Sequence, residues 1–150
     1  MNPKSIVALV AAAAVFAACK SSHRDPDSAA PPMPPASAEE QIALGAKAYG
    51  ANCARCHGDA GQGTRKAPPL VGVNALPLDP RPDQKLRKTQ FHTALDVAQF
   101  AVDNMPPDAD DRDEISPTEY WAIVAFDLNA NGVRLDGLLS PATAANYKLH

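Results

Sequence analysis

The feature that most constrains this chain is the pentapeptide Cys53-Ala54-Arg55-Cys56-His57. Side chains three and four residues apart lie on the same face of a helix. In a helical turn the two thiols and the imidazole therefore point to one side and can act together on a single bound group. We treat these three side chains as one candidate site.

Three chemistries use such a set of side chains. The two thiols can add to the two vinyl groups of one haem while His57 ligates the iron, and this spacing is a known signal for such attachment. The same residues could begin a zinc site, which needs a fourth ligand, and His92 is the only plausible one in the sequence. A Cys53–Cys56 disulfide, as in a redox dithiol, is the third possibility, but the adjacent histidine argues against it. We therefore predict one covalent haem c.

Residues 1–18 are predicted to be a signal peptide. Lys4 supplies a positive charge, and the apolar stretch Ile6–Ala18 has 13 residues, fewer than the ~20 that span a bilayer as a helix. The stretch ends in Phe16-Ala17-Ala18-Cys19, which resembles the lipobox of bacterial lipoproteins, although Phe16 stands where Leu is usual. We predict cleavage before Cys19 and lipid attachment to it. The alternative is ordinary signal cleavage beside an incidental cysteine.

The predicted domain organisation follows from these assignments. Lipid would use Cys19 and haem would use Cys53 and Cys56, so none of the three cysteines is left over. Residues 19–38 are rich in Pro, Ser and Ala, with almost nothing to bury, and are expected to form a disordered tether. The folded domain is expected over residues 39–150, with an extension from about residue 133. The protein should lie on the periplasmic side of a bacterial membrane, held there by its lipid anchor.

Helical signals dominate the domain. Ser37 and Glu40 form a capping box before a helix expected from about Glu39 into the Cys53 region. A second helix is expected over Thr93–Asp103, and a third from Ser116-Pro117 to a cap at Gly132. Ser140-Pro141 is a start signal for a last short helix towards Leu149. The Gly- and Pro-rich segment 58–90 is predicted to be irregular, and no segment alternates as a strand does, so the fold class is all-α.

From about Glu39 to Gly132 the chain resembles the class I c-type cytochromes. Gly58–Gly63 looks like their Gly-rich loop, and Ala67-Pro68-Pro69-Leu70 is similar to the segment whose proline carbonyl accepts the ring N–H of the proximal histidine. The resemblance implies a cytochrome c fold, in which N- and C-terminal helices cross around a covalent haem between long irregular loops. It also implies that Pro68 orients His57. The loop 73–90 and residues 133–150 depart from the shortest family members.

The sixth iron ligand should come from Met105. After processing only Met33 and Met105 remain, and Met33 lies in the predicted tether. Met105 stands in Asn104-Met105-Pro106-Pro107, where a proline ends the helix and fixes the loop. In the family a Met-Pro at this place is the distal ligand, so His57 and Met105 are the implied iron ligands. His92 is the alternative.

Other residues of the family pattern concern packing. Gly45 should let the two terminal helices approach closely, with Phe126 as the aromatic at their crossing. Trp121 and Tyr120 are expected either near the haem or at the same crossing, and the sequence does not distinguish these places.

Ligation by histidine and methionine saturates the iron, so the predicted function is electron transfer between a donor and an acceptor redox protein. The sequence offers no array of catalytic acid, base or nucleophile, and we expect an electron carrier rather than an enzyme. Two alternatives stay open. The chain could be a haem c subunit of a periplasmic dehydrogenase or oxidase complex, or a ligand-binding or peroxidatic haem protein.

The charged residues indicate which partners the protein can bind. The formal net charge is −3, whereas a nucleic-acid binder normally has an excess of basic residues, so nothing indicates nucleic-acid binding. An acidic run follows Met105 and is either a solvated surface or a patch that steers a basic partner: Asp103, Asp108, Asp110, Asp111, Asp113 and Glu114. A smaller basic cluster comprises Arg81, Lys85, Arg87 and Lys88. The sequence does not indicate an oligomeric state.

Overall fold

The computed structural model describes residues 33–150. The predicted signal peptide 1–18, the lipidation site Cys19 and most of the predicted tether lie outside these residues. The elements follow in the order α1 (Ala38–Asn52), α2 (Ala54–His57), α3 (Ala94–Asn104), α4 (Ala109–Asp113), α5 (Pro117–Ala130) and the short 3₁₀ helix η1 (Ala144–Asn146). Within 33–150 the only strand-like pairing is one isolated bridge between Thr93 and Lys148. The all-α prediction is confirmed.

Helices α1 and α5 begin at the predicted cap residues. The Ser37 hydroxyl accepts a hydrogen bond from the Glu40 N–H at 3.2 Å, at the start of α1. At the start of α5 Ser116 and Glu119 bond each other reciprocally, with the Ser116 N–H donating to Glu119 Oε2 at 2.9 Å. Such boxes satisfy N–H groups that have no partner inside the helix. The caps therefore fix where α1 and α5 begin.

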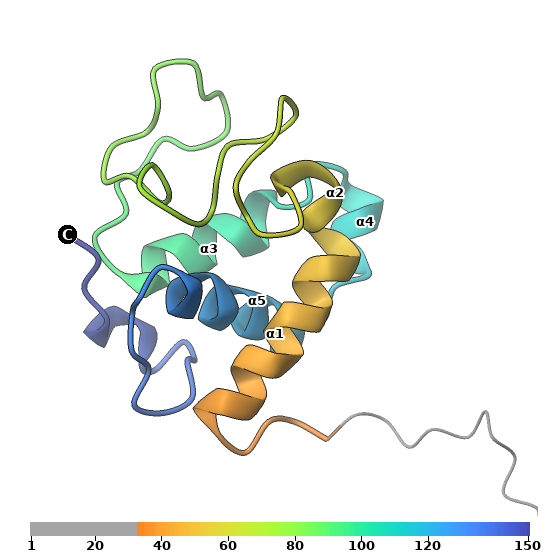
Figure 1. Ribbon diagram of the computed structural model, residues 1–150, viewed down its shortest axis with the longest axis vertical. Helices are drawn as coiled ribbons and strands as arrows, with labels where there is room; N and C mark the ends of the chain where they lie inside the picture. The colour runs from red at the N-terminus through yellow and green to blue at the C-terminus, as the bar shows by residue number, and fades with distance from the viewer. Residues whose placement is uncertain (1–32) are drawn as a thin grey trace, which may run out of the picture. The chain divides into compact units, whose positions relative to one another are not determined.

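Helices α1 and α5 cross where α1 carries Gly45 (Figure 1). A Cβ atom on Gly45 would lie 1.9 Å from the backbone oxygen of Ala122 and 2.9 Å from Cβ of Phe126. Only a residue without a side chain allows this approach. Just beyond the crossing, the rings of Tyr49 and Phe126 pack with their centroids 5.3 Å apart. The structure thus shows the contact that was expected for Gly45 and Phe126.

The segment 133–150 packs against the helices and is part of the domain core. Leu135, Leu139 and Ala144 are buried in the same cluster as residues of α3 and α5. The side-chain amide of Gln41 donates to the Leu139 carbonyl and accepts from the Leu139 N–H, both at 2.8 Å. This buried pair of bonds connects the C-terminal segment to the first turn of α1.

Two local predictions differ from the structure. The expected helix from Ser140 towards Leu149 is reduced to the three residues of η1. It ends at Asn146 because the following residues are extended and pair with the segment before α3: the Ala94 N–H donates to the Tyr147 oxygen at 3.0 Å, and the Leu149 N–H donates to the His92 oxygen at 2.9 Å. Helix α4, conversely, was not predicted. It forms inside the acidic run, where Asp108 caps it by accepting from the Asp110 N–H at 3.0 Å.

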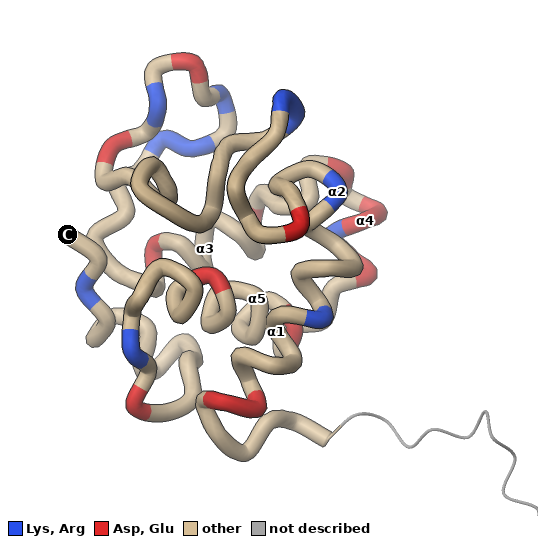
Figure 2. Tube along the Cα trace, viewed as in Figure 1, with Lys and Arg blue, Asp and Glu red and all other residues tan. Residues whose placement is uncertain are grey.

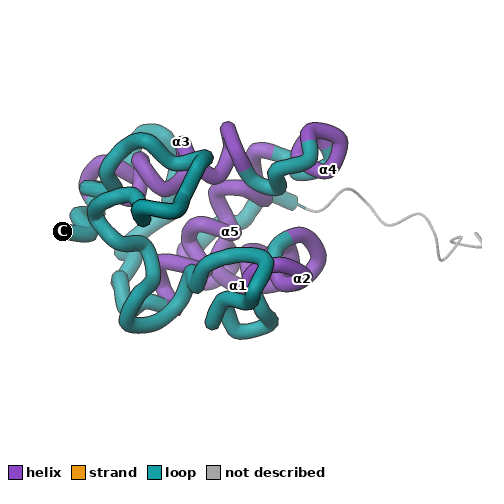
Figure 3. The backbone as a smooth tube through the Cα atoms, turned by 90° about the horizontal axis from the view of Figure 1, so that it is seen from above, coloured by secondary structure: helices purple, strands orange, loops and turns teal. Residues whose placement is uncertain are grey.

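The segment between α2 and α3 contains no helix or strand. It arches over α3 in Figure 1, and Figure 3 shows it as a long run of loop beside the helices. This agrees with the irregular segment expected from its Gly and Pro content. No helix among residues 33–150 has the length and apolar character that crossing a bilayer requires.

Candidate functional site

The predicted site residues come together around one cavity of about 680 Å³. Cys53, Cys56 and His57 line it from the α1–α2 junction, Pro68 from the following loop and Met105 from the end of α3. Ligand sites in proteins are ordinarily ~300–1,000 Å³ and mostly apolar. The cavity is wide enough for a large planar cofactor, and its floor is formed by apolar side chains of α3 and α5: Val97, Phe100, Ala101, Tyr120 and Ile123.

His57 is held by the backbone carbonyl predicted for it. The ring is 8% exposed, and Nδ1 lies 2.8 Å from the Pro68 oxygen. A hydrogen bond at one ring nitrogen fixes the tautomer and leaves the other nitrogen for a metal. Burial lowers the pKa of His57, against the opposing effect of the Pro68 bond, and so favours the neutral imidazole that ligates metals. Gly58 ends α2 directly after the ring, with a φ of +86° that suits glycine.

The cysteines do not have the properties of a redox dithiol. Both are free thiols in this structure. Burial, with a smaller contribution from the charge of Asp127, raises the pKa of Cys53 to about 12. An attacking thiol in a redox dithiol has a lowered pKa, because the thiolate is the nucleophile. Cys53 is thus unsuited to disulfide exchange at neutral pH.

A zinc site is also disfavoured. Across residues 33–150 no three His, Cys, Asp or Glu side chains gather in a way that could hold a metal ion. His92, the proposed fourth ligand, is exposed, and its Nε2 lies 3.0 Å from the amide oxygen of Gln90. It does not line the cavity, whereas Met105 does.

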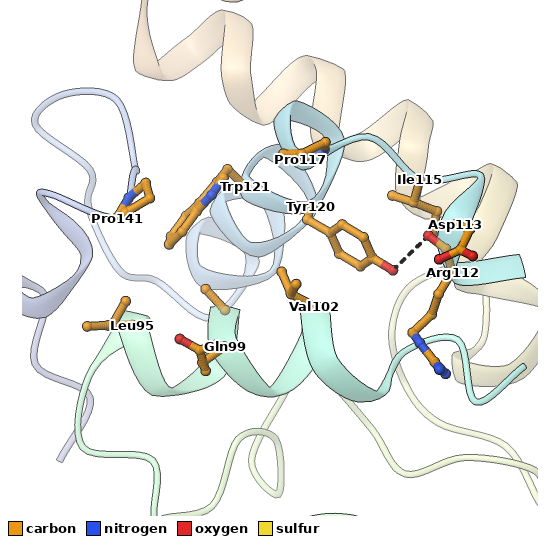
Figure 4. Close-up of a pocket in the computed structure, with 11 residues that line it drawn as sticks. Leu95, Gln99, Val102, Arg112, Asp113, Ile115, Pro117, Tyr120, Trp121 and Pro141 are labelled. Atoms are coloured by element: carbon orange, nitrogen blue, oxygen red, sulfur yellow. Dashed lines mark hydrogen bonds between the residues drawn. The ribbon is translucent and has the colours of Figure 1, made fainter. Parts of the chain in front are cut away.

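Met105 is presented by a loop that is fixed through its carbonyl groups. The Tyr120 hydroxyl donates to the Met105 oxygen at 2.6 Å. Arg112 Nη1 donates to the oxygens of Pro106 and Pro107 at 2.8 and 3.0 Å. In Figure 4 the Tyr120 hydroxyl points towards the Arg112 backbone, and the dashed line marks the longer 3.4 Å bond from Tyr120 to the Arg112 oxygen. Neither residue was predicted from the sequence to support Met105.

Arg87 supplies a buried positive charge to the cavity wall. It is 2% exposed, its Nη1 donates to the Pro77 oxygen at 2.8 Å, and Nη2 donates to the Asp79 oxygen. Its guanidinium carbon lies 4.0 Å from the centroid of the Phe91 ring, while its buried Nε–H has no partner. Burial lowers the pKa of Arg87, yet an arginine stays charged in proteins. A cofactor that carries carboxylates, as haem does in its propionates, would meet a cation and a free donor here.

These observations test whether the lining fits haem. Two thiols and an imidazole stand on one wall, a thioether stands on another, and the guanidinium of Arg87 has an orphaned donor. Haem c has a use for each of these groups, since the thiols can attach it, the imidazole and thioether can ligate its iron, and a cation can pair with its propionates. A zinc ion would leave most of the cavity unused. The donor set and the cavity fit a covalently attached haem.

Asp127 is a further polar residue in the lining. It sits inside α5, is 5% exposed, and its Oδ1 has no hydrogen-bond partner. Burial raises its pKa to about 8. The sequence contains a signal for its burial, because Tyr120, Ile123 and Asp127 recur at helical spacing and so share one face of α5.

A second cavity of about 470 Å³ lies between α3 and α5 (Figure 4). Leu95, Gln99 and Val102 of α3 line one side, and Tyr120 and Trp121 of α5 line the other. Tyr120 lines both cavities, whereas Trp121 lines only this second one. Of the two aromatics, Tyr120 is therefore the one near the candidate haem site.

Charged residues of both signs surround the first cavity. Asp108 and Asp111 of the acidic run line it beside Met105, and Lys66, Arg81 and Lys85 line it from the long loop. Figure 2 shows acidic residues along α4 and basic ones on the loops. Arg55 and Asp111 form an exposed ion pair at 3.1 Å between α2 and α4. Such pairs contribute little to stability, so these charges matter chiefly for what approaches the cavity.

Comparison with known proteins gives one family. Residues 40–126 match the model of a family described as cytochrome c oxidase, cbb3-type, subunit III. No curated protein sequence matches the chain. Among solved structures, the sulfane dehydrogenase SoxCD from Paracoccus pantotrophus is similar at 31% identity over 64% of this chain, with a TM-score of 0.45. The match covers 46% of that protein chain, so this chain spans less than half its length.

Proposed function

The chain belongs to the family described as cytochrome c oxidase, cbb3-type, subunit III, and is a c-type cytochrome with covalent haem c; from this premise we propose that it transfers electrons through one haem bound at Cys53, Cys56, His57 and Met105. One observation carries the proposal. The two thiols and the imidazole of residues 53–57 line the same cavity as the thioether of Met105, which comes from a distant segment of the chain. Bound haem would supply a one-electron couple on its iron.

The chain's own residues have distinct tasks in this proposal. The thiols of Cys53 and Cys56 would hold the haem through thioethers, and His57, whose ring nitrogen is bonded to the Pro68 carbonyl, would ligate its iron. Met105 would be the second iron ligand, and Tyr120 and Arg112 hold its loop. With both of these ligands bound, the iron would have little affinity for small molecules, so the protein would act as a carrier.

The partners in this proposal are a donor and an acceptor redox protein. Asp108 and Asp111 stand at the cavity beside the Met105 loop and give it an acidic rim. This placement supports docking of a basic partner, which a long-range field would steer. We place the protein outside the bacterial cytoplasm, anchored by lipid at Cys19, on the basis of the N-terminal sequence.

A second candidate is a haem c subunit of a larger oxidase or dehydrogenase complex. The family description favours it, since it refers to a subunit of a cytochrome c oxidase. Affinity purification from native membranes separates the two candidates. A stable set of co-purifying redox subunits supports the second, and recovery of the chain alone supports the free carrier.

The covalent bond is the first test of the site. Haem should remain with the polypeptide through acid–organic extraction of the wild type, and it should be absent from the Cys53→Ala/Cys56→Ala double variant. His92→Ala should retain it, because His92 does not line the cavity. Haem that is extractable from the wild type contradicts attachment at this motif. Rapid binding of carbon monoxide to the reduced wild type would instead favour a ligand-binding protein.

A further inference from the structure

Helix α5 places one carboxyl group in the wall of the haem cavity. Asp127 lies inside α5, is 5% exposed and lines the cavity together with Cys53 and His57. Its backbone oxygen accepts from the Asn131 side chain at 2.7 Å, but its side-chain Oδ1 has no partner. The carboxyl therefore neither caps a helix nor joins a hydrogen-bond network that would explain its burial.

The groups that face Asp127 provide no countercharge. Tyr49 of α1 and Cys53 at the α1–α2 junction interact with it electrostatically, and the Tyr49 hydroxyl is committed to the Gly58 oxygen at 2.7 Å. Cys56 and His57 of α2 share the cavity wall, where they would form a thioether and ligate the iron. Ala101 of α3 and Ile123 of α5 are apolar, and the Tyr120 hydroxyl of α5 donates to the Met105 oxygen.

No cation of the cavity lining pairs with Asp127. Arg55 pairs with Asp111 at 3.1 Å, and Arg81 and Arg87 donate to backbone oxygens of the long loop. Lys66 and Lys85 also line the cavity, but both are exposed and neither is bonded to Asp127. Burial is accordingly the cause that shifts the pKa of Asp127, and it raises that pKa to about 8. Haem in the cavity would displace water and desolvate the carboxyl further. The other acidic groups there would be its propionates and the side chains of Asp108 and Asp111, which are less buried than Asp127.

We propose that Asp127 is a redox-linked proton site, at which the carboxyl binds one proton when the haem iron in the cavity is reduced by one electron. This inference rests on the proposed function, since it requires haem in this cavity. The net positive charge of ferric haem iron favours the ionised form of the Asp127 side chain. Reduction removes one positive charge from a region of low dielectric, so the carboxylate becomes less stable and the neutral acid is favoured. The electron comes from the donor protein and the proton from solvent, and both leave on oxidation.

The consequence is a reduction potential that depends on pH. Between the pKa of Asp127 in the oxidised protein and its higher pKa in the reduced protein, reduction takes up protons. The equilibrium constant for reduction then falls by up to tenfold per pH unit, which is ~59 mV for a one-electron couple. Outside this interval the potential no longer changes with pH through this residue.

The test compares holoproteins by potentiometric titration between pH 5 and 10. Wild type should show a potential that falls as pH rises across an interval near neutrality, and Asp127→Asn should be flat there. Redox-difference infrared spectra provide a second readout, because the reduced wild type should gain a protonated carboxyl band that Asp127→Asn lacks. Asp111→Asn is the matched control. It removes a carboxylate that lines the same cavity but is half-exposed and ion-paired, so it should leave the slope intact.

Each other outcome overturns the proposal. A slope of equal size in Asp127→Asn would assign the proton to another group, such as a propionate. A flat wild-type potential over the whole range, with no carboxyl band, would overturn it even if the variant failed to fold. Failure of the proposed function is distinguishable, because the wild type would then show no covalent haem and no reversible one-electron couple.

Discussion

Several side chains of the haem site are held through backbone carbonyl groups. The Pro68 carbonyl fixes the ring of His57, and the Met105 carbonyl is fixed by the Tyr120 hydroxyl. Carbonyl partners carry no net charge, so they orient a ligand without changing the charge of the site. Among the Asp, Arg and Lys side chains that line the cavity only Arg87 and Asp127 are buried, and each has an unpaired polar atom. These two residues should therefore affect the reduction potential of the site more than the carbonyl groups that orient the ligands do.

Met105→Ala is expected to lower the reduction potential. A thioether sulfur favours ferrous over ferric iron, so its loss should shift the potential downward, by an amount well within the ~0.8 V range that axial ligands set. The variant should lose the long-wavelength charge-transfer band of Met-ligated ferric haem and should bind carbon monoxide when reduced. Absorption spectra and potentiometric titration measure these changes. His92→Ala is the control and should change none of them; the reverse pattern would assign the ligand to His92.

Asp127→Asn is expected to stabilise the protein at high pH. The pKa of Asp127 is about 8 in the folded protein, against ~3.9 for an unfolded aspartate. Between these values the folded state binds the extra proton, so the stability of the wild type falls as pH rises from about 4 through 8. At pH 9 the wild-type side chain is a buried charge, whereas the variant's amide is neutral, so the variant should be more stable by ~3–5 kcal/mol, the usual cost of an uncompensated buried charge. Denaturant unfolding at pH 5, 7 and 9 measures this, and parallel curves for the two proteins would contradict it.

The residues of the site differ in how far sequence can predict them. Cys53, Cys56 and His57 are contiguous, so their shared face follows from helical spacing alone. Asp127 interrupts an apolar face of α5, which is a detectable signal for a buried polar group. Arg87 has no such signal, because it lies in an irregular loop where no periodicity relates a residue to the core. Its burial depends on how that loop folds back on Phe91.

At the scale of elements, side-chain caps determine where the helices begin and one glycine determines how two of them pack. The cap residues of α1 and α5 could be predicted because capping is a local interaction. Helix α4 could not, because five residues in an acidic run show no apolar period. Its role is nevertheless structural, since Arg112 in this helix bonds the oxygens of Pro106 and Pro107 and so supports the Met105 loop.

Gly45→Ala is expected to destabilise the protein by ~1–3 kcal/mol, the usual cost of overpacking. Its new Cβ would lie 1.9 Å from the Ala122 oxygen, so α1 and α5 would have to separate. Gly50→Ala is a matched control in the same helix, since its Cβ would meet nothing within 4 Å. That change should be neutral or stabilise by up to ~1 kcal/mol through helix propensity. Thermal unfolding of both variants tests the crossing, and equal effects would show that propensity rather than packing decides.

At the scale of the whole molecule, helices and loops of the domain surround the cavity that would hold the cofactor. Aromatic residues are 5% of the chain, and a cavity of about 680 Å³ lies between α1–α2, α3 and α5. The composition indicated a small core, and the helical periods indicated the fold class. The course of the loop between α2 and α3 could not be predicted, because Gly and Pro specify turns but not which surface a loop covers.

The predicted lipid anchor at Cys19 is separate from the haem site along the chain. Cys19 lies outside residues 33–150, while every site residue lies within them. Cys19→Ser should therefore move the mature protein from the membrane to the soluble periplasmic fraction with an unchanged haem spectrum. Ser22→Ala, a change in the same segment, is the control and should leave the protein with the membrane. Fractionation followed by haem staining measures both variants. If Cys19→Ser stays with membranes after a high-salt wash, the lipid anchor is wrong. If the high-salt wash releases the Cys19→Ser variant, a protein partner holds the domain through surface charges. Salt screens those charges but does not extract a lipid chain.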